Sequence, residues 1–309
     1  MSSNLTMQQI DVVIPVYNGA DCILDTLNTV FAQILPEGWS MKVYVVDDAS
    51  TDDTQVLVRT TYPQVHLVDL SSNQGRSIAR NQGAAAGRGE LLCFLDSDCQ
   101  YQSREALAAY IEVLNESVDV SFGPLDTDLP GFWGRYQRAV YSRRIVQAKQ
   151  GNMQVMTSNN FILRRSAFER IQGFYTGYTH YGFEDYDLLQ RLLSTGCDIR
   201  FCENAAANHK NDDTLGALCH KLNISAQYSA PLFMQEHPQA YAIMSFAKVD
   251  ARLHPALRYL NWLGTPLLPV LKNVGERGVY WPLPYRFKKL YVQGVMALSY
   301  LRGSAQPSG

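Results

Sequence analysis

The sequence has few cysteines, little net charge and no long apolar run. Its six cysteines form no Cys-x-x-Cys pair, so we expect reduced thiols, which fits the cytosol. A net charge of −2 gives no indication of nucleic acid as a partner. No segment reaches the roughly 18 apolar residues of a membrane span. The N-terminus is short and polar, which predicts no signal peptide.

Internal repeats are also absent. A chain of 309 residues can bury a large core, either as one large domain or as one domain with a tail. A turn-rich segment at 124–134 connects two halves without being a linker between independent domains.

The most informative stretch that is present is an apolar run at 91–95 that ends in Asp96-Ser97-Asp98. Such a run predicts a strand buried on both faces of a parallel sheet. Residues two apart at a strand end point the same way, so both carboxylates can face one site. A hard divalent cation, Mg²⁺ or Mn²⁺, shared with substrate phosphates would neutralise them. The alternative is a solvated turn.

Other segments extend this pattern. Strands are predicted at 10–16, 42–46 and 65–70, and an Ala-rich helix opens within 73–83. Ser50 or Asp52 would cap the helix after the second strand. The alternation of strand and helix from residue 10 to about 125 predicts βαβ units and a mostly parallel sheet.

Several motifs occur in a recognisable order. They are Val12-Val13-Ile14-Pro15-Val16-Tyr17-Asn18, Val45-Val46-Asp47-Asp48-Ala49-Ser50-Thr51-Asp52, Asn73-Gln74-Gly75 with Ala79-Arg80-Asn81, Phe94-Leu95-Asp96-Ser97-Asp98, and Phe183-Glu184-Asp185-Tyr186-Asp187-Leu188. This series resembles family 2 glycosyltransferases over residues 10 to about 210. The resemblance implies an α/β, GT-A-type, Rossmann-like fold with a mixed, mostly parallel sheet flanked by helices. It also implies inverting transfer of a sugar from a nucleotide-diphosphate donor, with UDP expected.

The resemblance gives each donor-side residue a role. Pro15 and Tyr17 would lie under the base, and Asp48 would accept a hydrogen bond from the uracil N–H. Arg80, with Arg76 as a helper, would contact the diphosphate through a planar guanidinium. Asp96 would lie toward the ribose and metal, and Asp98 would ligate the cation. The structural alternatives are a helix cap for Asp48, a solvated helix face or a salt-bridge partner for Arg80, and a strand end for Pro15.

His209 lies after the strand-like segment 198–202, where this fold often supplies a further metal ligand; a structural histidine is the alternative. The segment 157–165 resembles the family's acceptor side, so Asn159 and Asn160 would contact sugar hydroxyls unless they form a polar turn entering a strand. Tyr178, His180 and Tyr181 belong to an aromatic loop that would contact the acceptor or pack within itself.

Asp185 is the predicted catalytic base, because inverting transfer needs one carboxylate to remove the acceptor proton. Glu184 is the alternative, since neighbouring helical side chains point about 100° apart. Asp187 is interpreted as N-terminal helix charge. The apolar stripe of this helix is predicted to comprise Leu188, Leu189, Leu192 and Leu193.

The C-terminal part reads as helical, with helix-like spacing over 214–233 and 239–253. We therefore expect a transferase domain at 1–212, with a donor half to about 123 and an acceptor half from 124, and a helical extension at 213–309. Within 251–303, aromatic and basic residues alternate and Glu276 is the only acid. This composition suits the surface of an anionic membrane, a helical lid or a dimer contact.

Three functions were compared. The first is a metal-dependent inverting hexosyl- or N-acetylhexosaminyltransferase for a glycan or lipid-linked acceptor, as in polysaccharide, cell-surface glycan or glycolipid synthesis. The second is a nucleotidyltransferase, which would have a Gly-rich basic loop after its first strand, where this chain has Tyr17-Asn18-Gly19-Ala20-Asp21. The third is a non-catalytic membrane-associated scaffold. The expected location is the cytoplasm, peripheral on the inner membrane face if the C-terminal segment binds lipid.

Overall fold

The computed structural model describes residues 7–114, 117–210 and 214–307. The chain divides into two compact units. Unit 1 comprises Met1–Leu129, Gln137–Thr176 and Arg191–Asn211. Unit 2 comprises Pro130–Tyr136, Gly177–Gln190 and Asp212–Gly309. The domain boundary expected at 212 lies in 211–213, outside the described residues.

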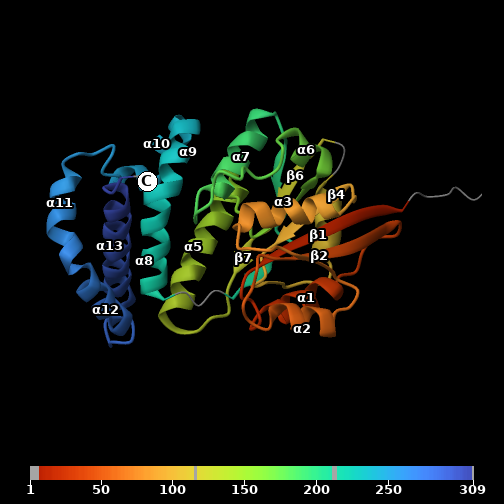
Figure 1. The fold of residues 1–309 in the computed structure, drawn as a ribbon, viewed down its shortest axis with the longest axis horizontal. Coiled ribbons are helices and arrows are strands. Elements are labelled where there is room, and N and C mark those ends of the chain that lie inside the picture. The colour runs from red at the N-terminus through yellow and green to blue at the C-terminus, as the bar shows by residue number, and fades with distance from the viewer. Residues whose placement is uncertain (1–6, 115–116, 211–213, 308–309) are drawn as a thin grey trace, which may run out of the picture. The chain divides into compact units, whose positions relative to one another are not determined.

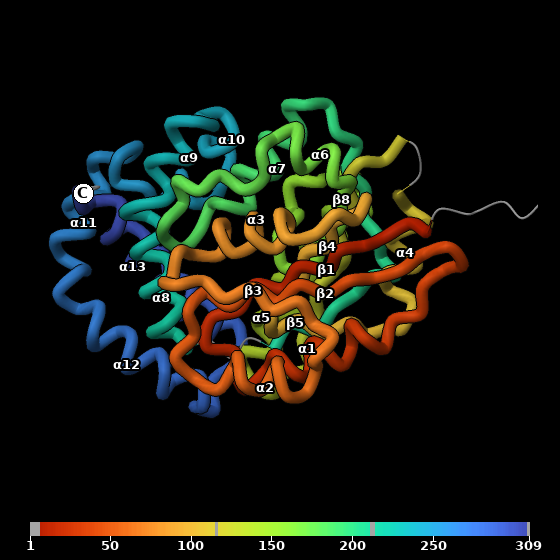
Figure 2. The backbone as a smooth tube through the Cα atoms, turned by 45° about the vertical axis from the view of Figure 1, so that its right-hand side comes forward, coloured from red at the N-terminus to blue at the C-terminus, as the bar shows by residue number. Residues whose placement is uncertain are grey.

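Unit 1 is built on a seven-stranded sheet of order β3-β2-β1-β4-β8-β6-β9. The first four strands of this order are mutually parallel, whereas β8 runs antiparallel to β4 and β6. Figure 2 shows β3, β2, β1, β4 and β8 in sequence across the sheet. The strands are β1 Gln8–Val16, β2 Trp39–Asp47, β3 His66–Asp69, β4 Leu91–Leu95, β6 Val120–Phe122, β8 Asn160–Arg164 and β9 Ile199–Phe201.

A second sheet of three short strands, in the order β5-β10-β7, belongs to the same unit. Its strands are β5 Cys99–Tyr101, β7 Leu125–Asp126 and β10 Ala207–His209. β10 pairs antiparallel with β5, and this register sets His209 opposite Cys99. The small sheet therefore brings residue 209 to the loop that follows β4.

Helices cover both faces of the main sheet. On one face, Ile10, Val12 and Ile14 of β1 share a buried apolar cluster with Ile23 and Leu27 of α1. On the other, α3 packs so closely that a Cβ at Gly83 would collide with Val13 and Val46. Figure 1 shows α1 and α2 on one side of β1 and β2, and α3 on the other. The helices are α1 Ile23–Phe31, α2 Thr54–Thr61, α3 Arg76–Ala86, α4 Ala106–Val113 and α6 Arg165–Arg170.

Two helices contribute to both units, namely α5 Gly131–Lys149 and α7 Glu184–Ser194. The rest of unit 2 is helical. Its α helices are α8 Leu215–Ile224, α9 Ala230–Glu236, α10 Pro238–Ala242, α11 Leu257–Gly264, α12 Leu268–Gly278 and α13 Tyr285–Ser304. Five residues of π-helix, Ser225–Ser229, join α8 to α9. Among the described residues, no helix combines the length and apolarity needed to cross a bilayer.

The structure confirms the strands predicted at 10–16, 42–46, 65–70 and 91–95, the helix opening within 73–83, and a mixed, mostly parallel sheet. Pro15 lies at a strand end, beyond the last β1–β4 pair. All six cysteines are free thiols.

Three local predictions were wrong. The cap of α2 is Asp53, although the Asp52 carboxylate still accepts the Thr54 N–H at 3.1 Å. Leu193 is 37% exposed, because the buried stripe of α7 ends at Leu192. The segment 239–253 is not one helix, since extended backbone at Met244 separates α10 from the 3₁₀ turn Ser245–Val249.

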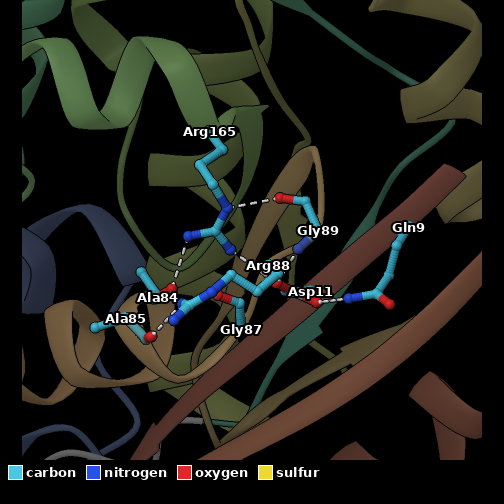
Figure 3. A network of polar contacts seen from close by, with 8 residues as sticks. All are labelled: Gln9, Asp11, Ala84, Ala85, Gly87, Arg88, Gly89 and Arg165. Atoms are coloured by element: carbon cyan, nitrogen blue, oxygen red, sulfur yellow. Dashed lines mark hydrogen bonds and ion pairs between the residues drawn. The ribbon is translucent and has the colours of Figure 1, made fainter.

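A buried carboxylate ties the elements of unit 1 together (Figure 3). Asp11 of β1 is fully buried and accepts the Gly89 N–H at 2.6 Å and Arg165 Nη2 at 2.7 Å through one oxygen. Arg165, the first residue of α6, also donates to Gly89 O at 2.6 Å and Ala84 O at 2.7 Å. Any side chain at Gly87 would collide with the Asp11 carboxylate, so the turn must pass close to it.

We predict that Asp11→Ala lowers the free energy of unfolding by about 3 kcal/mol, because it leaves the largely buried Arg165 guanidinium without its carboxylate. Chemical denaturation at 25 °C measures this difference. Glu90→Ala is the control, since Glu90 is exposed and contacts Gln8 at the surface, and its effect should stay within about 0.5 kcal/mol. An Asp11→Ala protein as stable as the control would contradict the role of this ion pair.

Candidate active site

The loops that follow β1 and β2 are joined by side-chain hydrogen bonds. Asn18 donates its backbone N–H to Ser50 Oγ at 2.8 Å, and its side-chain oxygen accepts the Thr51 N–H at 2.8 Å. The Gly19 N–H donates to Thr54 Oγ1 at 2.9 Å. The carboxyl ends of parallel strands share one sheet edge, where open α/β folds bind ligands. These hydrogen bonds connect the two loops at that edge.

Tyr17 and Pro15 lie at this edge with side chains open to solvent. Tyr17 is 50% exposed and Pro15 is half-buried. Asp48, which follows β2, is instead 4% exposed. Its two oxygens accept the backbone N–H groups of Gln74 at 2.7 Å and Gly75 at 2.8 Å. Gly75, with a φ of 89°, is the N-cap of α3, so Asp48 fixes where that helix begins.

The α3 helix carries Arg80 into the interior of unit 1. The side chain is 1% exposed, and its Nη2 donates to Asp96 Oδ1 at 2.6 Å. Its carbon Cζ lies 5.2 Å from the centre of the Phe174 ring. Among the described residues, its Nε and Nη1 have no hydrogen-bond partner. Buried N–H donors without partners are costly, so this guanidinium is suited to hold an anion.

Asp96 is fully engaged by neighbouring side chains. One oxygen accepts from Arg80, and the other accepts Asn159 Nδ2 at 2.5 Å. The Asp96 backbone N–H also donates to Asn159 O at 2.9 Å. Arg80 therefore balances the charge of Asp96 in the structure, and a role for this carboxylate toward a cation stays a prediction.

Asp98 faces His209 across the β5–β10 ladder. His209 Nε2 lies 3.2 Å from Asp98 Oδ2, and the Lys210 N–H donates to Asp98 O at 2.9 Å. Burial raises the pKa of the Asp98 carboxyl, but the hydrogen bond and charge of His209, with Arg76 nearby, bring it below its ordinary value. His209 Nδ1 shares a hydrogen bond of 2.7 Å with Tyr141 Oη of α5.

The donor atoms at this point fit a divalent cation. One oxygen of Asp98, one ring nitrogen of His209 and Cys99 Sγ lie within 4.8 Å of one another. Burial raises the pKa of the Cys99 thiol well above its ordinary value. Its soft sulfur also suits a hard ion less well than oxygen does. A carboxylate oxygen and an imidazole nitrogen remain, and Mn²⁺ accepts both.

Asn160 does not fit the acceptor role expected for it. It is 2% exposed; its side-chain oxygen accepts Tyr110 Oη at 2.9 Å and its Nδ2 donates to Ala205 O at 2.7 Å. The alternative interpretation, a polar turn entering a strand, describes this residue. Asn159 is half-buried, and its amide positions Asp96.

The remaining predicted residues belong to unit 2. Tyr178 is 4% exposed and packs in an apolar cluster with Phe183 and Phe233, which corresponds to the packing alternative. His180 is exposed and stacks on Tyr228, with ring centres 4.1 Å apart. Tyr181 is 39% exposed and lies under Lys221 Nζ at 5.5 Å.

Both candidate bases lie in the first turn of α7. Glu184 is 4% exposed and Asp185 is half-buried. Asp187 is buried, and its Oδ1 contacts His237 Nε2 at 2.9 Å, which gives it a structural partner. Asp185 is thus the more exposed of the two carboxylates, and the choice between them stays a prediction.

Two residues of this site were missed by sequence reasoning. Tyr141 lies in an arginine-rich helix with no pattern that indicates a contact with His209. Sequence reasoning considered Cys99 only as one of the six cysteines of the chain. Nothing in the sequence indicated that the ring of Phe174 would lie against Arg80.

Comparison with curated proteins gives partial matches. The chain is 32% identical over 128 residues to glycosyltransferase AglE of Haloferax volcanii, covering 40% of this chain and 42% of that protein. It is 34% identical over 110 residues to the teichuronic acid biosynthesis glycosyltransferase TuaG, described as putative, of Bacillus subtilis, covering 35% and 42%. The matched segments thus span about two fifths of these relatives' own length.

Solved structures share the fold over most of the chain. Mannosyltransferase PcManGT of Pyrobaculum calidifontis, in complex with GDP-Man and Mn²⁺, has a TM-score of 0.61 at 19% identity, covering 95% of this chain and 86% of that one. TarS 1–349 of Staphylococcus aureus, in complex with UDP-GlcNAc, has a TM-score of 0.53 at 17% identity, covering 96% and 91%. These likenesses establish a GT-A fold.

Two family descriptions match the sequence directly. Residues 146–211 match a family described as the N-terminal domain of galactosyltransferase. Residues 11–172, more than half of the chain, match the glycosyl transferase family 2 description and include Asp48, Arg80, Asp96 and Asp98. The chain belongs to glycosyl transferase family 2.

Proposed function

We propose that this chain is a metal-dependent inverting glycosyltransferase that moves a sugar from a nucleotide-diphosphate donor to a hydroxyl of a glycan or lipid-linked acceptor. The observation that carries the proposal is the buried guanidinium of Arg80 on α3, whose Nε and Nη1 have no partner among the described residues. Its Nη2 donates to Asp96, which follows β4 and lies two residues before Asp98. A pyrophosphate offers oxygen atoms that would accept hydrogen bonds from these two N–H groups.

The donor would bind along the edge formed by β1, β2 and β4. Tyr17 and Pro15 would contact the base, and Arg80 and Arg76 would contact the diphosphate. Asp48 retains acceptor capacity beyond its two backbone contacts, because each carboxylate oxygen accepts more than one hydrogen bond. Relatives of this fold were solved with GDP-Man and with UDP-GlcNAc, and we propose UDP here on the strength of Asp48.

Asp98 and His209 would hold the cation, Mn²⁺ or Mg²⁺, while Asp96 would keep Arg80 in position from the ribose side. When bound, the cation offsets negative charge on the departing nucleotide diphosphate. Several solved relatives of this fold contain Mn²⁺, which supports the choice of metal.

Asp185 would act as the general base, with Glu184 as the alternative. As the acceptor oxygen attacks the anomeric carbon, Asp185 removes its proton, and the bond from that carbon to the diphosphate oxygen breaks. The new bond forms on the opposite face, which inverts the anomeric centre.

Asn159, Tyr181 and His180 remain candidates for acceptor contacts. We also propose a peripheral location at an anionic membrane, which is argued below.

The proposal is tested by calorimetric titration of UDP with and without Mn²⁺. We predict metal-dependent binding that Asp98→Ala abolishes, because the variant removes the carboxylate that holds the cation against the phosphates. Glu37→Ala, which removes an exposed carboxylate in the loop before β2, should bind as the wild type does. Normal UDP binding by Asp98→Ala in the presence of Mn²⁺ would refute the metal site. A preference for triphosphates would favour a nucleotidyltransferase, and absence of nucleotide binding would favour a scaffold.

Tyr141 should position His209 for the metal. Ligating histidines usually hold their second ring nitrogen in a hydrogen bond, and losing that bond weakens metal affinity by roughly tenfold or more. We predict this loss in Tyr141→Phe, measured by direct titration of Mn²⁺ without substrate. Tyr62→Phe removes a hydroxyl that contacts Asn28 instead and should leave Mn²⁺ affinity unchanged. Equal affinities in both variants would assign Tyr141 a packing role only.

Substitution of the base should separate binding from chemistry. We predict that Asp185→Asn binds UDP and Mn²⁺ normally but transfers sugar on the order of 10²-fold more slowly, the usual effect of losing a general base. Glu184→Gln serves as the matched variant, and its rate should stay near that of the wild type. If Glu184→Gln is slow and Asp185→Asn is not, the base is Glu184.

A further inference from the structure

Unit 2 exposes a continuous apolar stripe along α11, the 3₁₀ turn Thr265–Leu267 and α12. The stripe consists of Tyr259, Trp262, Leu263, Leu267, Val270 and Val274, which recur at three- and four-residue helical spacing. Tyr259 is 78% exposed and Trp262 is 75% exposed. No residue of α11 is buried. An exposed apolar surface of this extent marks an interaction site.

The opposite side of these helices is already occupied by the rest of the unit. A side chain at Gly264 would collide with Leu298 of α13, and one at Gly275 would collide with Leu215 of α8. Leu268 is buried in the same apolar cluster as Leu215. The segment therefore has two apolar sides, of which the fold covers one. Packing within unit 2 does not explain the exposed stripe.

A second exposed apolar group follows on the loop after α12 and the first turns of α13. It consists of Tyr280, Trp281, Leu283, Phe287 and Leu290, with Tyr280 at 83% and Leu290 at 70% exposure. Two cations lie in the same turns, the exposed Arg286 and the half-buried Lys289, and the Arg286 guanidinium lies 4.8 Å from the centre of the Phe287 ring. Aromatic side chains interleaved with cations are typical of surfaces that lie at the bilayer interface.

Within 251–303, every charged side chain except Glu276 is basic. Arg258 and Arg277 are exposed on α11 and α12, in addition to the exposed Arg286 and the half-buried Lys289 on α13. The single acid within 251–303, Glu276, accepts the Gly216 N–H at 2.7 Å and is only partly exposed. This surface is complementary to anionic headgroups, to which each nearby Lys or Arg adds attraction.

We propose that the exposed face of α11, α12 and the start of α13 binds the surface of an anionic lipid bilayer, with its aromatic and aliphatic side chains entering the headgroup boundary. This contact is independent of the proposed sugar transfer, because it uses neither nucleotide nor metal. This contact keeps the protein at the membrane, where lipid-linked acceptors are found.

The test is co-sedimentation of the full chain with vesicles, without nucleotide or metal. The full chain should bind vesicles of phosphatidylcholine with phosphatidylglycerol, and bind those of phosphatidylcholine alone much more weakly. The triple variant Tyr259→Ser, Trp262→Ser and Leu263→Ser should bind the anionic vesicles roughly tenfold or more weakly, because the apolar area it would bury is lost. Arg286→Glu with Lys289→Glu should weaken binding by at least about fivefold per charge and reduce its salt dependence.

A matched control changes three exposed apolar residues elsewhere, namely Ile34→Ser, Val56→Ser and Val146→Ser in unit 1. The control should bind vesicles as the wild type does, and circular dichroism should show equal helix content in all variants. Asp98→Ala should also bind vesicles normally, which separates this proposal from the proposed transfer.

Three results would overturn the proposal. One is failure of the full chain to bind anionic vesicles, and another is equal binding by the stripe variant and the control. The third is a vesicle-independent dimer in light scattering that the stripe variant converts to monomer, since a second copy of the chain would then cover this face.

Discussion

The buried contact between Arg80 and Asp96 is the interaction on which the site of unit 1 depends. The Arg80 guanidinium is 1% exposed, so its loss of hydration must be offset by an opposite charge and by hydrogen bonds. Asp96 supplies the charge and one hydrogen bond, while Nε and Nη1 have no partner among the described residues. Asn159 holds the second oxygen of Asp96, so the carboxylate cannot turn away. The unpartnered N–H groups of Arg80 are then fixed donors in a water-poor setting, where electrostatic interactions are stronger than in bulk solvent.

The surrounding fold holds α3, which carries Arg80, at both ends. At its start, Asp48 accepts the N–H groups of Gln74 and Gly75. Beyond its end, the Asp11 carboxylate and Arg165 hold the turn that leads to β4, and Asp96 directly follows that strand. The absence of a side chain at Gly83 lets the middle of α3 approach β1 and β2 closely. The Asp11–Arg165 ion pair at one end of the sheet thereby supports the position of Arg80 at the other.

The sequence predicted those parts of this arrangement that depend on residues close together in the chain. Continuous apolar runs identified β1, β2 and β4, and their shared direction placed Asp48 and Asp96 at one edge. Periodicity does not distinguish parallel from antiparallel strands, so the reversed direction of β8 was not foreseen. The contact between Asp98 and His209 depends on strands of three residues, too short to give a pattern, and only the family resemblance suggested it. Tyr141 and the buried amide of Asn160 depend on partners distant in sequence, which no local signal specifies.

The central claim is that Arg80 and the Asp98–His209 pair hold a nucleotide diphosphate and its cation together. A crystal structure with UDP and Mn²⁺, using the anomalous signal of manganese, tests this most directly. The account predicts a manganese peak bonded to Asp98 and His209, and a phosphate oxygen within hydrogen-bond distance of Arg80 Nε or Nη1. Manganese bound elsewhere, or a diphosphate that leaves both Arg80 donors without a partner, would contradict it.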